Sequence, residues 1–401
     1  MKSILLIYHF FHPDTVISAR LFSDLAEELA KDHDVTVFTG NRLIRSEEIL
    51  SESEEWKKVK IQRFSRPNFS QGSNFGRLFN SAILQMKWLN AFRKNRKKFD
   101  TVIIGTDPQF AYMMFPFMRM MNRKVRLIHW VFDLYPEAIL VNSPRWMKIL
   151  AALTKPFIPW AYRSVDDMVD IGGCMRDRLR KYKNKAKYTT LTPWALAEVP
   201  APPAADAEIR ENLFGKAKIG LLYSGTVGYA HDLKPFIELA RQCRKSGIDA
   251  AFCFAGYGNQ YKIQTAEITE EDTNIRLAGF ASEEELEKRL SAADIHMVSL
   301  RPGWEGIVVP SKFFGSLAIG RPALFSGPEN SDISLWCKEH GVGFTLTENT
   351  VDELKKFIEH ETALTELQQT CYQVYTEHFS KKSVIDGWKK LLKKSLEGEK
   401  I

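Results

Sequence analysis

Short apolar runs alternate with helical patterns along the whole chain, and no other feature limits the possible folds as strongly. In the first half these runs are Ile4–Tyr8, Val35–Phe38, Val59–Phe64, Thr101–Ile104, Arg126–Phe132 and Met168–Ile171. Runs without polar alternation fit strands that are buried on both faces. Strands that alternate with helices favour a parallel, doubly wound sheet.

A segment rich in Pro and Ala, VPAPPAAD at Val199–Asp206, follows the first set of strands and has no periodicity, which is typical of a linker. A second alternating set follows it, with runs at Ile219–Tyr223, Ala251–Ala255, Ile275–Ala278, Ile295–Leu300 and Ala323–Phe325. A chain of 401 residues is also too long for one compact core.

These patterns predict an α/β protein with two Rossmann-like domains, at residues 1–195 and 207–380, joined by a linker at 196–206. An amphipathic Lys/Leu/Trp pattern predicts a last helix at 382–398. The chain begins in a strand without the features of a secretion signal, and no segment is long enough to span a bilayer. Five scattered Cys without metal-ligand spacing favour a reducing cytoplasm.

Two of the expected strands in the second half end in glycine turns. Gly225 and Thr226 follow one strand, and Gly256, Tyr257 and Gly258 follow the next. Ligands of open parallel sheets bind at the carboxyl ends of the strands, so both turns are candidate binding elements. Each turn taken alone fits an ordinary strand–helix connection equally well.

The segment SLRPGWEGIVVPSK contains the strongest candidate for binding an anion. Pro310 and Ser311 predict a helix start, with Ser311 as its cap, and a helix start is electropositive. The ammonium of Lys312 adds a charge suited to a diphosphate, and Glu305 beside Gly306 is placed to hold sugar hydroxyls. The plainer interpretations are a solvated lysine at a helix start and a loop carboxylate.

These motifs, together with RLAGFASEEEL, SAADIHMVSL, LAIGRP, WVFDLYPEA and TPWA, resemble glycosyltransferase family 4. This family comprises retaining enzymes of the GT-B fold, with two Rossmann-like domains that face a cleft. The resemblance is greatest to bacterial transferases that build O-antigen, capsule or exopolysaccharide. It implies an acceptor-binding first domain, onto which the last helix packs back, and a donor-binding second domain.

The resemblance also implies an activity. A hexosyl or N-acetylhexosaminyl group would pass from a nucleotide-diphosphate sugar to a saccharide linked to polyprenyl diphosphate. The leaving diphosphate would accept the acceptor proton, so its electrostatic stabilisation would be the main catalytic task. No metal or other cofactor is expected, and Asp32-His33-Asp34, which matches a DxD metal motif, is interpreted as a solvated turn.

The resemblance assigns candidate residues to three roles. The catalytic candidates are Glu305, Lys312, Asp133 and His129. The donor-binding candidates are Gly225, Thr226, Gly256, Tyr257, Gly258, Phe280, Arg301, Gly306 and Ser311. The acceptor-binding candidates are His9 and His12, for which a purely structural loop is an equal alternative; Asp133 has the alternative of capping the turn that follows it.

One family feature is missing. Many members carry a second Glu that contacts the donor ribose, and its position here corresponds to Phe313 by strict spacing or to Gly315 by the helix end. The ribose contact therefore stays unassigned. Two rival functions remain open, namely a sugar-nucleotide epimerase of the same fold and a non-catalytic scaffold recruited to the membrane.

Charge is concentrated in one segment, Lys57–Phe99, which has twelve basic residues and no acidic one, interleaved with Phe and Trp. One interpretation is a solvated charged face. Another is docking to an anionic membrane surface, which would place the protein at the inner face of the plasma membrane, near a lipid-linked acceptor. Nucleic-acid binding is not favoured, because no recognised module accompanies the basic residues.

Overall fold

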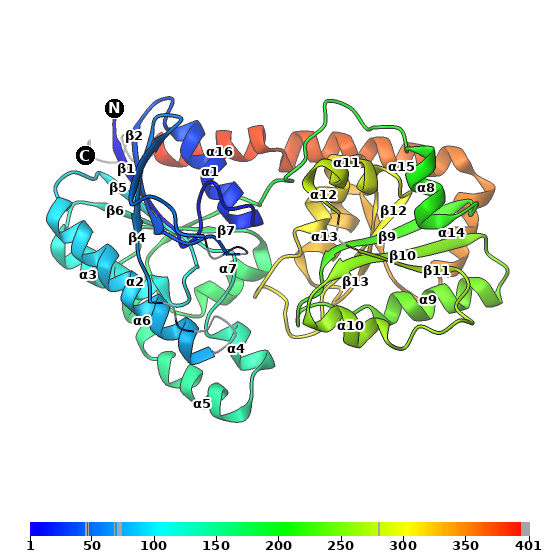
Figure 1. The fold of residues 1–401 in the computed structure, drawn as a ribbon, viewed down its shortest axis with the longest axis horizontal. Helices are drawn as coiled ribbons and strands as arrows, with labels where there is room; N and C mark the ends of the chain where they lie inside the picture. The colour runs from blue at the N-terminus through cyan, green and yellow to red at the C-terminus, as the bar shows by residue number, and fades with distance from the viewer. Residues whose placement is uncertain (45, 47, 68, 70–73, 280, 394–401) are drawn as a thin grey trace. The chain divides into compact units, whose positions relative to one another are not determined.

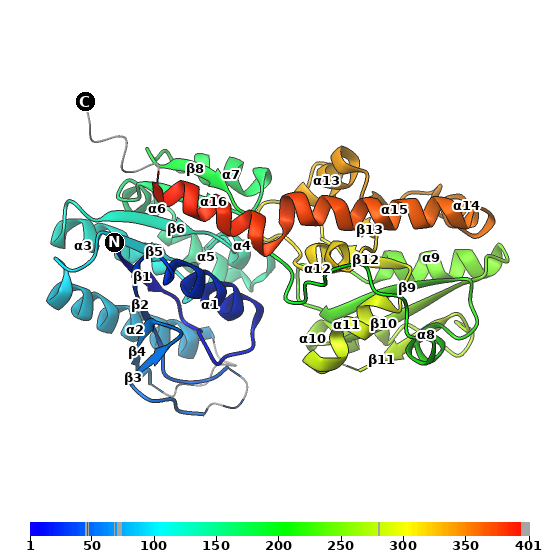
Figure 2. The same cartoon turned by 90° about the horizontal axis from the view of Figure 1, so that it is seen from above.

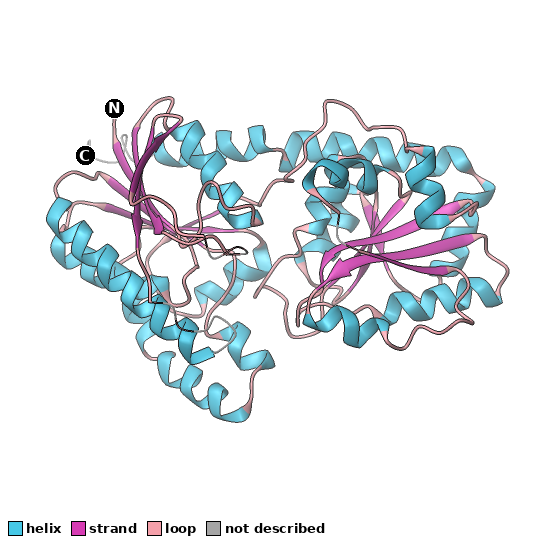
Figure 3. Cartoon of the chain, in the orientation of Figure 1, coloured by secondary structure: helices cyan, strands magenta, loops and turns pink. Residues whose placement is uncertain are grey.

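The computed structural model describes residues 1–44, 46, 48–67, 69, 74–279 and 281–393. The chain forms two compact units, each with its own sheet (Figure 1). The first unit combines Met1–Thr192 with the chain from Ile385 onward, and the second unit is Pro193–Val384. In each unit, helices cover both faces of the sheet (Figure 3), so this is an α/β protein with two Rossmann-like sheets.

The sheet of the first unit has eight strands in the order β3-β4-β2-β1-β5-β6-β7-β8. The strands are β1 (Ser3–Ile7), β2 (Asp34–Gly40), β3 (Ser53–Trp56), β4 (Val59–Phe64), β5 (Thr101–Ile104), β6 (Arg126–Trp130), β7 (Asp167–Asp170) and β8 (Lys187–Thr190). All neighbours pair in parallel except β3 and β4, which form an antiparallel hairpin at the edge. The central strands are buried on both faces, as their uninterrupted apolar runs predict.

The helices of the first unit are α1 (Ile17–Leu29), α2 (Asn74–Asn95), the short 3-10 helix η1 (Ala111–Met113), α3 (Met114–Met121), α4 (Glu137–Asn142), α5 (Arg145–Thr154), α6 (Phe157–Tyr162) and α7 (Gly173–Arg180). Between β6 and β7 the chain forms three short helices, α4 to α6, where a parallel crossover needs only one.

The last helix, α16 (Lys381–Lys393), completes the core of the first unit. The indole of Trp388 is fully buried, and its ring centroid lies 5.0 Å from that of Trp130 on β6. Arg126 donates a hydrogen bond to the Leu391 carbonyl at 3.0 Å, which fixes the end of the helix. Figure 2 shows this end of α16 beside α1, where Lys389 lies 3.8 Å from Glu28.

The sheet of the second unit has six parallel strands in the order β11-β10-β9-β12-β13-β14. The strands are β9 (Ile219–Thr226), β10 (Ala250–Tyr257), β11 (Ile275–Ala278), β12 (Ile295–Ser299), β13 (Ala323–Ser326) and β14 (Gly343–Thr345). The helices are α8 (Ala207–Phe214), α9 (Lys234–Lys245), α10 (Asn259–Thr265), α11 (Glu283–Ser291), α12 (Lys312–Ala318), α13 (Asp332–His340), α14 (Thr350–Glu359) and α15 (Glu361–Val374). A π-helical turn at Tyr375–Phe379 connects α15 to α16.

The Pro-rich segment before α8 is attached to the second unit by hydrogen bonds. The buried guanidinium of Arg321, in the LAIGRP motif, donates to the Pro203 carbonyl at 3.0 Å and to the Ser291 carbonyl at 2.9 Å. The hydroxyl of Tyr372 donates to the Val199 carbonyl at 2.9 Å. These contacts give LAIGRP a structural role, because its arginine joins the segment to the sheet.

Candidate functional site

The carboxyl ends of β9 and β10 bring four of the predicted donor-binding residues together. The two strands pair in register up to Gly225 opposite Gly256 and Thr226 opposite Tyr257. Gly225 has a φ of 117°, which side-chain-bearing residues rarely adopt. A Cβ on Gly256 would lie 2.6 Å from the Gly225 carbonyl oxygen, so only glycine fits there. Gly258 follows directly and precedes α10.

Lys312 is the first residue of α12, and its side chain reaches this strand end. Its Nζ donates to the Thr226 carbonyl at 3.0 Å and lies 5.0 Å from the ring centroid of the buried Tyr223. A Cβ at Gly225 would lie 3.2 Å from the lysine Cε, so a glycine at this position makes room for the lysine. Burial lowers the pKa of the Lys312 ammonium to about 8.

Arg301 provides a second cation, and it is held by neighbouring backbone. Its Nε donates to the His231 carbonyl at 2.9 Å, and its guanidinium lies 3.8 Å from the Asp232 carboxylate. His231 has an Nδ1 2.9 Å from the Ser299 carbonyl, and burial, with a contribution from the Lys312 charge, lowers its pKa to about 3. The imidazole is therefore neutral and orders the loop between β9 and α9.

Glu305 lies in a tight turn after β12. The Trp304 amide donates to the Arg301 carbonyl at 3.2 Å, and the Ile307 amide donates to the Trp304 carbonyl at 3.0 Å. Trp304 and Ile307 are buried, Glu305 is half-buried, and Gly306 takes a φ of 66°. Two buried anchors and a left-handed glycine therefore fix the backbone that carries the carboxylate.

Ser311 differs from the prediction, because its side chain does not cap α12. The residue has a helical backbone, with φ of −63° and ψ of −18°, and its carbonyl accepts from the Phe314 amide at 3.2 Å. A capping serine instead has an extended backbone, which lets its oxygen turn back toward the first amides. The helix start therefore lacks the predicted side-chain cap.

The two positions that correspond to the second family Glu have different surroundings. Phe313 is fully buried and packs against Phe314, Trp336 and Phe379, so it belongs to the core. Gly315 is half-buried on the same helix. Phe280, a predicted contact of the base, lies outside the described residues.

In the first unit, three polar side chains gather at the carboxyl ends of β1, β5 and β6. His9 follows β1, and its Nδ1 lies 3.1 Å from Oδ1 of Asp107, which follows β5. Asp133 follows β6, and burial together with the Asp107 charge raises its pKa to about 6. The sequence analysis missed Asp107, although its place after the strand at Thr101–Ile104 is the signal that singled out Asp133 after the next strand.

The two other histidines predicted in this unit lie elsewhere. His129 is fully buried within β6, where its Nδ1 lies 2.9 Å from the Ile104 carbonyl and burial lowers its pKa to about 4. The rings of Phe115 and Tyr162 surround it, so it is a neutral core residue with no exposed atom to offer a substrate. His12 stacks on Trp56 with ring centroids 4.4 Å apart, beside β3.

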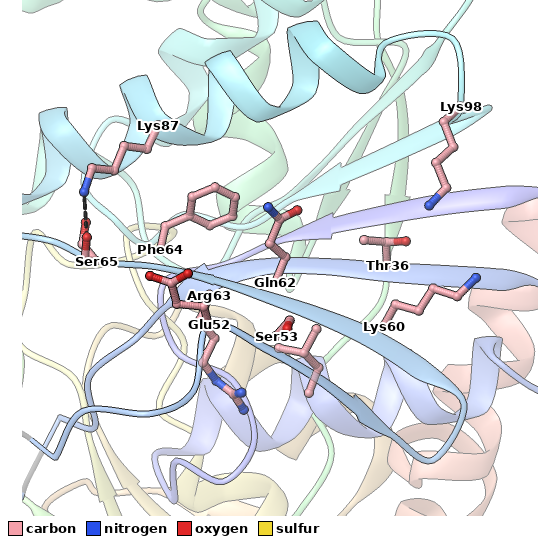
Figure 4. A pocket seen from close by; sticks show the side chains of 11 residues that line it. Thr36, Glu52, Ser53, Lys60, Gln62, Arg63, Phe64, Ser65, Lys87 and Lys98 are labelled. Carbon is pink, nitrogen blue, oxygen red and sulfur yellow. Dashed lines mark hydrogen bonds between the residues drawn. The ribbon is translucent and has the colours of Figure 1, made fainter.

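A cavity of about 460 Å³ lies between α2 and the edge strands β2 to β4 (Figure 4). None of the predicted site residues lines it. Lys60, Lys87 and Lys98 line it, and all three belong to the basic segment Lys57–Phe99. Lys87 donates to the backbone and hydroxyl oxygens of Ser65. Gln62 and Phe64 point toward α2 in this view.

The aromatic residues of the basic segment divide between the core and the surface. Trp88, Phe92 and Phe99 are buried in the first unit, whereas Phe69 and Phe79 are half or more exposed. The basic side chains at the end of α2 and just after it are exposed, namely Arg93, Lys94, Arg96, Lys97 and Lys98.

Two further features bear on metals and membranes. Asp34, within the DxD-like sequence, pairs with Lys60 at 2.8 Å. Within the described part of the chain, His, Cys, Asp and Glu form no group of three that could hold a metal ion. The helices that the structure describes include none that is both long and apolar enough to cross a bilayer.

Comparison with known proteins gives one similar curated sequence and many similar structures. The chain is 25% identical over 345 residues to the probable glycosyltransferase WbjE of Pseudomonas aeruginosa, covering 83% of this chain and 84% of that protein. No family model matches the chain.

Two solved structures illustrate the shared fold. Anabaena Alr3699/HepE, in complex with UDP and glucose, aligns with a TM-score of 0.65 at 11% identity, over 98% of this chain and 100% of that one. WaaG, a glycosyltransferase involved in lipopolysaccharide biosynthesis, aligns with a TM-score of 0.62 at 12% identity, over 96% and 98%. The sequence similarity to WbjE and the two Rossmann-like sheets both indicate a glycosyltransferase of this fold. This chain is a glycosyltransferase of the GT-B fold, similar to family 4.

Proposed function

We propose that this glycosyltransferase transfers a sugar, with retention of configuration, from a nucleotide-diphosphate sugar to a lipid-linked saccharide in bacterial surface-polysaccharide synthesis. The observation that carries the donor part is the position of Lys312, whose ammonium lies at the joined ends of β9 and β10. The solved HepE structure with UDP and glucose supports a nucleotide donor. WaaG, with its role in lipopolysaccharide biosynthesis, supports a surface-glycan product.

The donor diphosphate would lie against the second unit. Lys312 and Arg301 would neutralise its charge. Gly225 and Gly256 would let Lys312 and the two strand ends pack closely beside the ligand, and Tyr257, which is 41% exposed, would border the base. Two protein cations at this position make a metal-independent reaction our preferred mechanism.

The sugar would be held by Glu305, whose carboxylate accepts hydrogen bonds from sugar hydroxyls. As the glycosidic bond breaks, the bonding electrons pass to the diphosphate oxygen, and negative charge grows where Lys312 can stabilise it. The acceptor hydroxyl oxygen would bond to the anomeric carbon on the face that the diphosphate leaves, and the same diphosphate oxygen would take the hydroxyl proton. On the first unit, His9, Asp107 and Asp133 are our candidates for contacting the acceptor, because they gather at one strand edge.

Donor binding provides the direct test. A thermal-shift screen against UDP-, GDP-, ADP- and TDP-sugars without added metal should raise the melting temperature with one nucleotide family. Donor at about 100 times its dissociation constant adds about 2.7 kcal/mol of stability. We expect Lys312→Ala to abolish the shift and the exposed Lys234→Ala, in the same unit, to keep it. A well-folded protein that responds to none of the donors would contradict the proposal and favour the scaffold.

The lowered pKa of Lys312 predicts how donor affinity depends on pH. With a pKa of about 8, the ammonium is mostly protonated at about pH 7 and mostly neutral at about pH 9. If the diphosphate binds the protonated form, affinity should fall about tenfold across this interval, as calorimetry can measure. Lys312→Arg keeps its charge over this range, so its affinity should stay constant. An equal decline in both proteins would assign the dependence to another group.

A further inference from the structure

The helices between β6 and β7 expose an unusual amount of apolar surface. Trp146, Ile149 and Leu153 on α5 are 47%, 59% and 63% exposed. Phe157 and Trp160 on α6 are 55% and 43% exposed. In Figure 1 these two helices lie at one edge of the first unit, beyond its sheet. Exposure of several large apolar side chains on consecutive helices usually marks an interaction surface.

The pattern along α5 shows that the exposure is not incidental. Trp146, Ile149 and Leu153 are spaced by three and four residues, so they lie on one face of the helix. Met147 and Ala151, on another face, are buried against the first unit. A helix that is apolar on both sides is normally buried all round. The outer face of α5 is therefore as apolar as a buried surface, although it is exposed in the isolated chain.

The apolar face continues onto α3. The rings of Trp160 and Phe117 are in contact, with centroids 5.8 Å apart and an edge-on geometry. Met120, one turn along α3 from Phe117, is 66% exposed. We name the surface formed by Phe117, Met120, Trp146, Ile149, Leu153, Phe157 and Trp160 the α3–α6 face.

The segment that forms α5 and α6 carries charges of one sign, whereas on α3 Arg119 is paired with the exposed Asp166. From residue 138 to residue 165 the chain carries four basic side chains and no acidic one. Arg145, Lys155 and Arg163 are exposed, and Lys148 is half-buried. Exposed Arg123 and Lys124 follow directly after α3. The apolar face is thus accompanied by cations, and its partner should be both apolar and anionic.

We propose that the α3–α6 face docks onto the surface of an anionic lipid bilayer. Trp and Phe prefer the level of the lipid headgroups, and Lys and Arg near the surface are attracted to anionic lipids. With ten and six residues, α5 and α6 are too short to span a bilayer, so they would lie within its interface. A second copy fits less well, because a two-fold contact would place the same cations opposite one another.

This assignment differs from docking through Lys57–Phe99, where Trp88, Phe92 and Phe99 are buried and unavailable. The proposed function explains why the enzyme would bind a membrane, since a lipid-linked acceptor lies there. The physical basis is the exposed face itself. Vesicle binding can therefore be tested separately from donor binding.

The test is vesicle flotation of the full chain with phosphatidylcholine vesicles containing about 30% phosphatidylglycerol, compared with phosphatidylcholine alone. The variant is Leu153→Ser with Phe157→Ser, and the matched control is Phe79→Ser with Met86→Ser on α2, where both side chains are similarly exposed. We expect wild type and control to float with anionic vesicles. The α5–α6 variant should bind at least about tenfold more weakly, because it loses two large apolar groups.

Three results would overturn the proposal. The control pair could lose binding while the α5–α6 pair keeps it, which would assign docking to the basic segment. The wild type could fail to bind either kind of vesicle. It could also form a dimer by light scattering that the α5–α6 pair alone disrupts, which would identify a second copy as the partner. Both variants should keep the donor-induced thermal shift, so failure here would leave the donor site intact.

Discussion

Glu305→Gln is expected to lower turnover about 10²–10³-fold while donor affinity changes by no more than a few-fold. The neutral amide keeps the size of the carboxylate, so the turn anchored by Trp304 and Ile307 should persist. What is lost is the negative charge beside a sugar that becomes electron-poor as its bond to the diphosphate breaks. Donor affinity should survive, because the proposed site binds the diphosphate through Lys312 and Arg301.

Turnover of the donor with a lipid-linked acceptor, and donor affinity by calorimetry, are the two measurements that separate these effects. Glu348→Gln is the matched control, because Glu348 is exposed in the same unit. It should behave as wild type. If Glu305→Gln turns over within about twofold of wild type, the carboxylate has no part in the transition state.

Trp388→Ala is expected to destabilise the first unit by about 3–5 kcal/mol, the usual cost of removing a buried tryptophan. The indole has no exposed surface and lies edge-on to Trp130 in the centre of the sheet. Its loss leaves a cavity between α16 and β6. Lys390→Ala, at an exposed position on the opposite side of the helix from Trp388, should cost less than about 0.5 kcal/mol.

Urea unfolding followed by circular dichroism measures this effect, and two units can give two transitions that are fitted separately. The transition of the second unit should stay in place, since Trp388 belongs to the first. A loss below about 1 kcal/mol would mean that α16 contributes little to the first unit.

The central strands could be predicted because each one is marked by its own short apolar run in the sequence. Ile4–Tyr8, Thr101–Ile104 and Ala251–Ala255 are apolar runs too short for helices, and all three form buried parallel strands. The hairpin strand Ser53–Trp56 gave no such signal. Three of its four residues are exposed, and it exists only because it pairs with β4.

The arrangement of the candidate site could be predicted where it depends on the course of the backbone. It was harder to predict where it depends on the direction of a side chain. Except for Gly258, the predicted glycine turns are the last residues of β9 and β10 themselves, and they meet the lysine of α12 because the carboxyl ends of parallel strands lie at one edge of the sheet. His129 looked equivalent to Asp133, but it lies four residues earlier, inside β6, and its ring faces the core. Serine is a residue type that often caps helices, but Ser311 has a helical backbone and its side chain makes no capping hydrogen bond.

The exposed face of α5 was also beyond sequence reasoning. A run such as WMKILAAL fits a buried helix as well as an exposed one, because periodicity cannot show whether a neighbour covers the outer side. Only the packing of Met147 and Ala151 shows which side is covered.

The return of the chain to its first unit has a consequence for synthesis on the ribosome. Residues of the first sheet emerge first, yet Trp388, which fills the space beside Trp130, is made only after the whole second unit. The second unit is continuous from Pro193 to Val384 and is completed before the part of α16 that belongs to the first unit has emerged. The nascent first unit therefore waits with an open apolar groove for nearly two hundred residues of elongation, and it is the part of the newborn chain that most needs protection from aggregation.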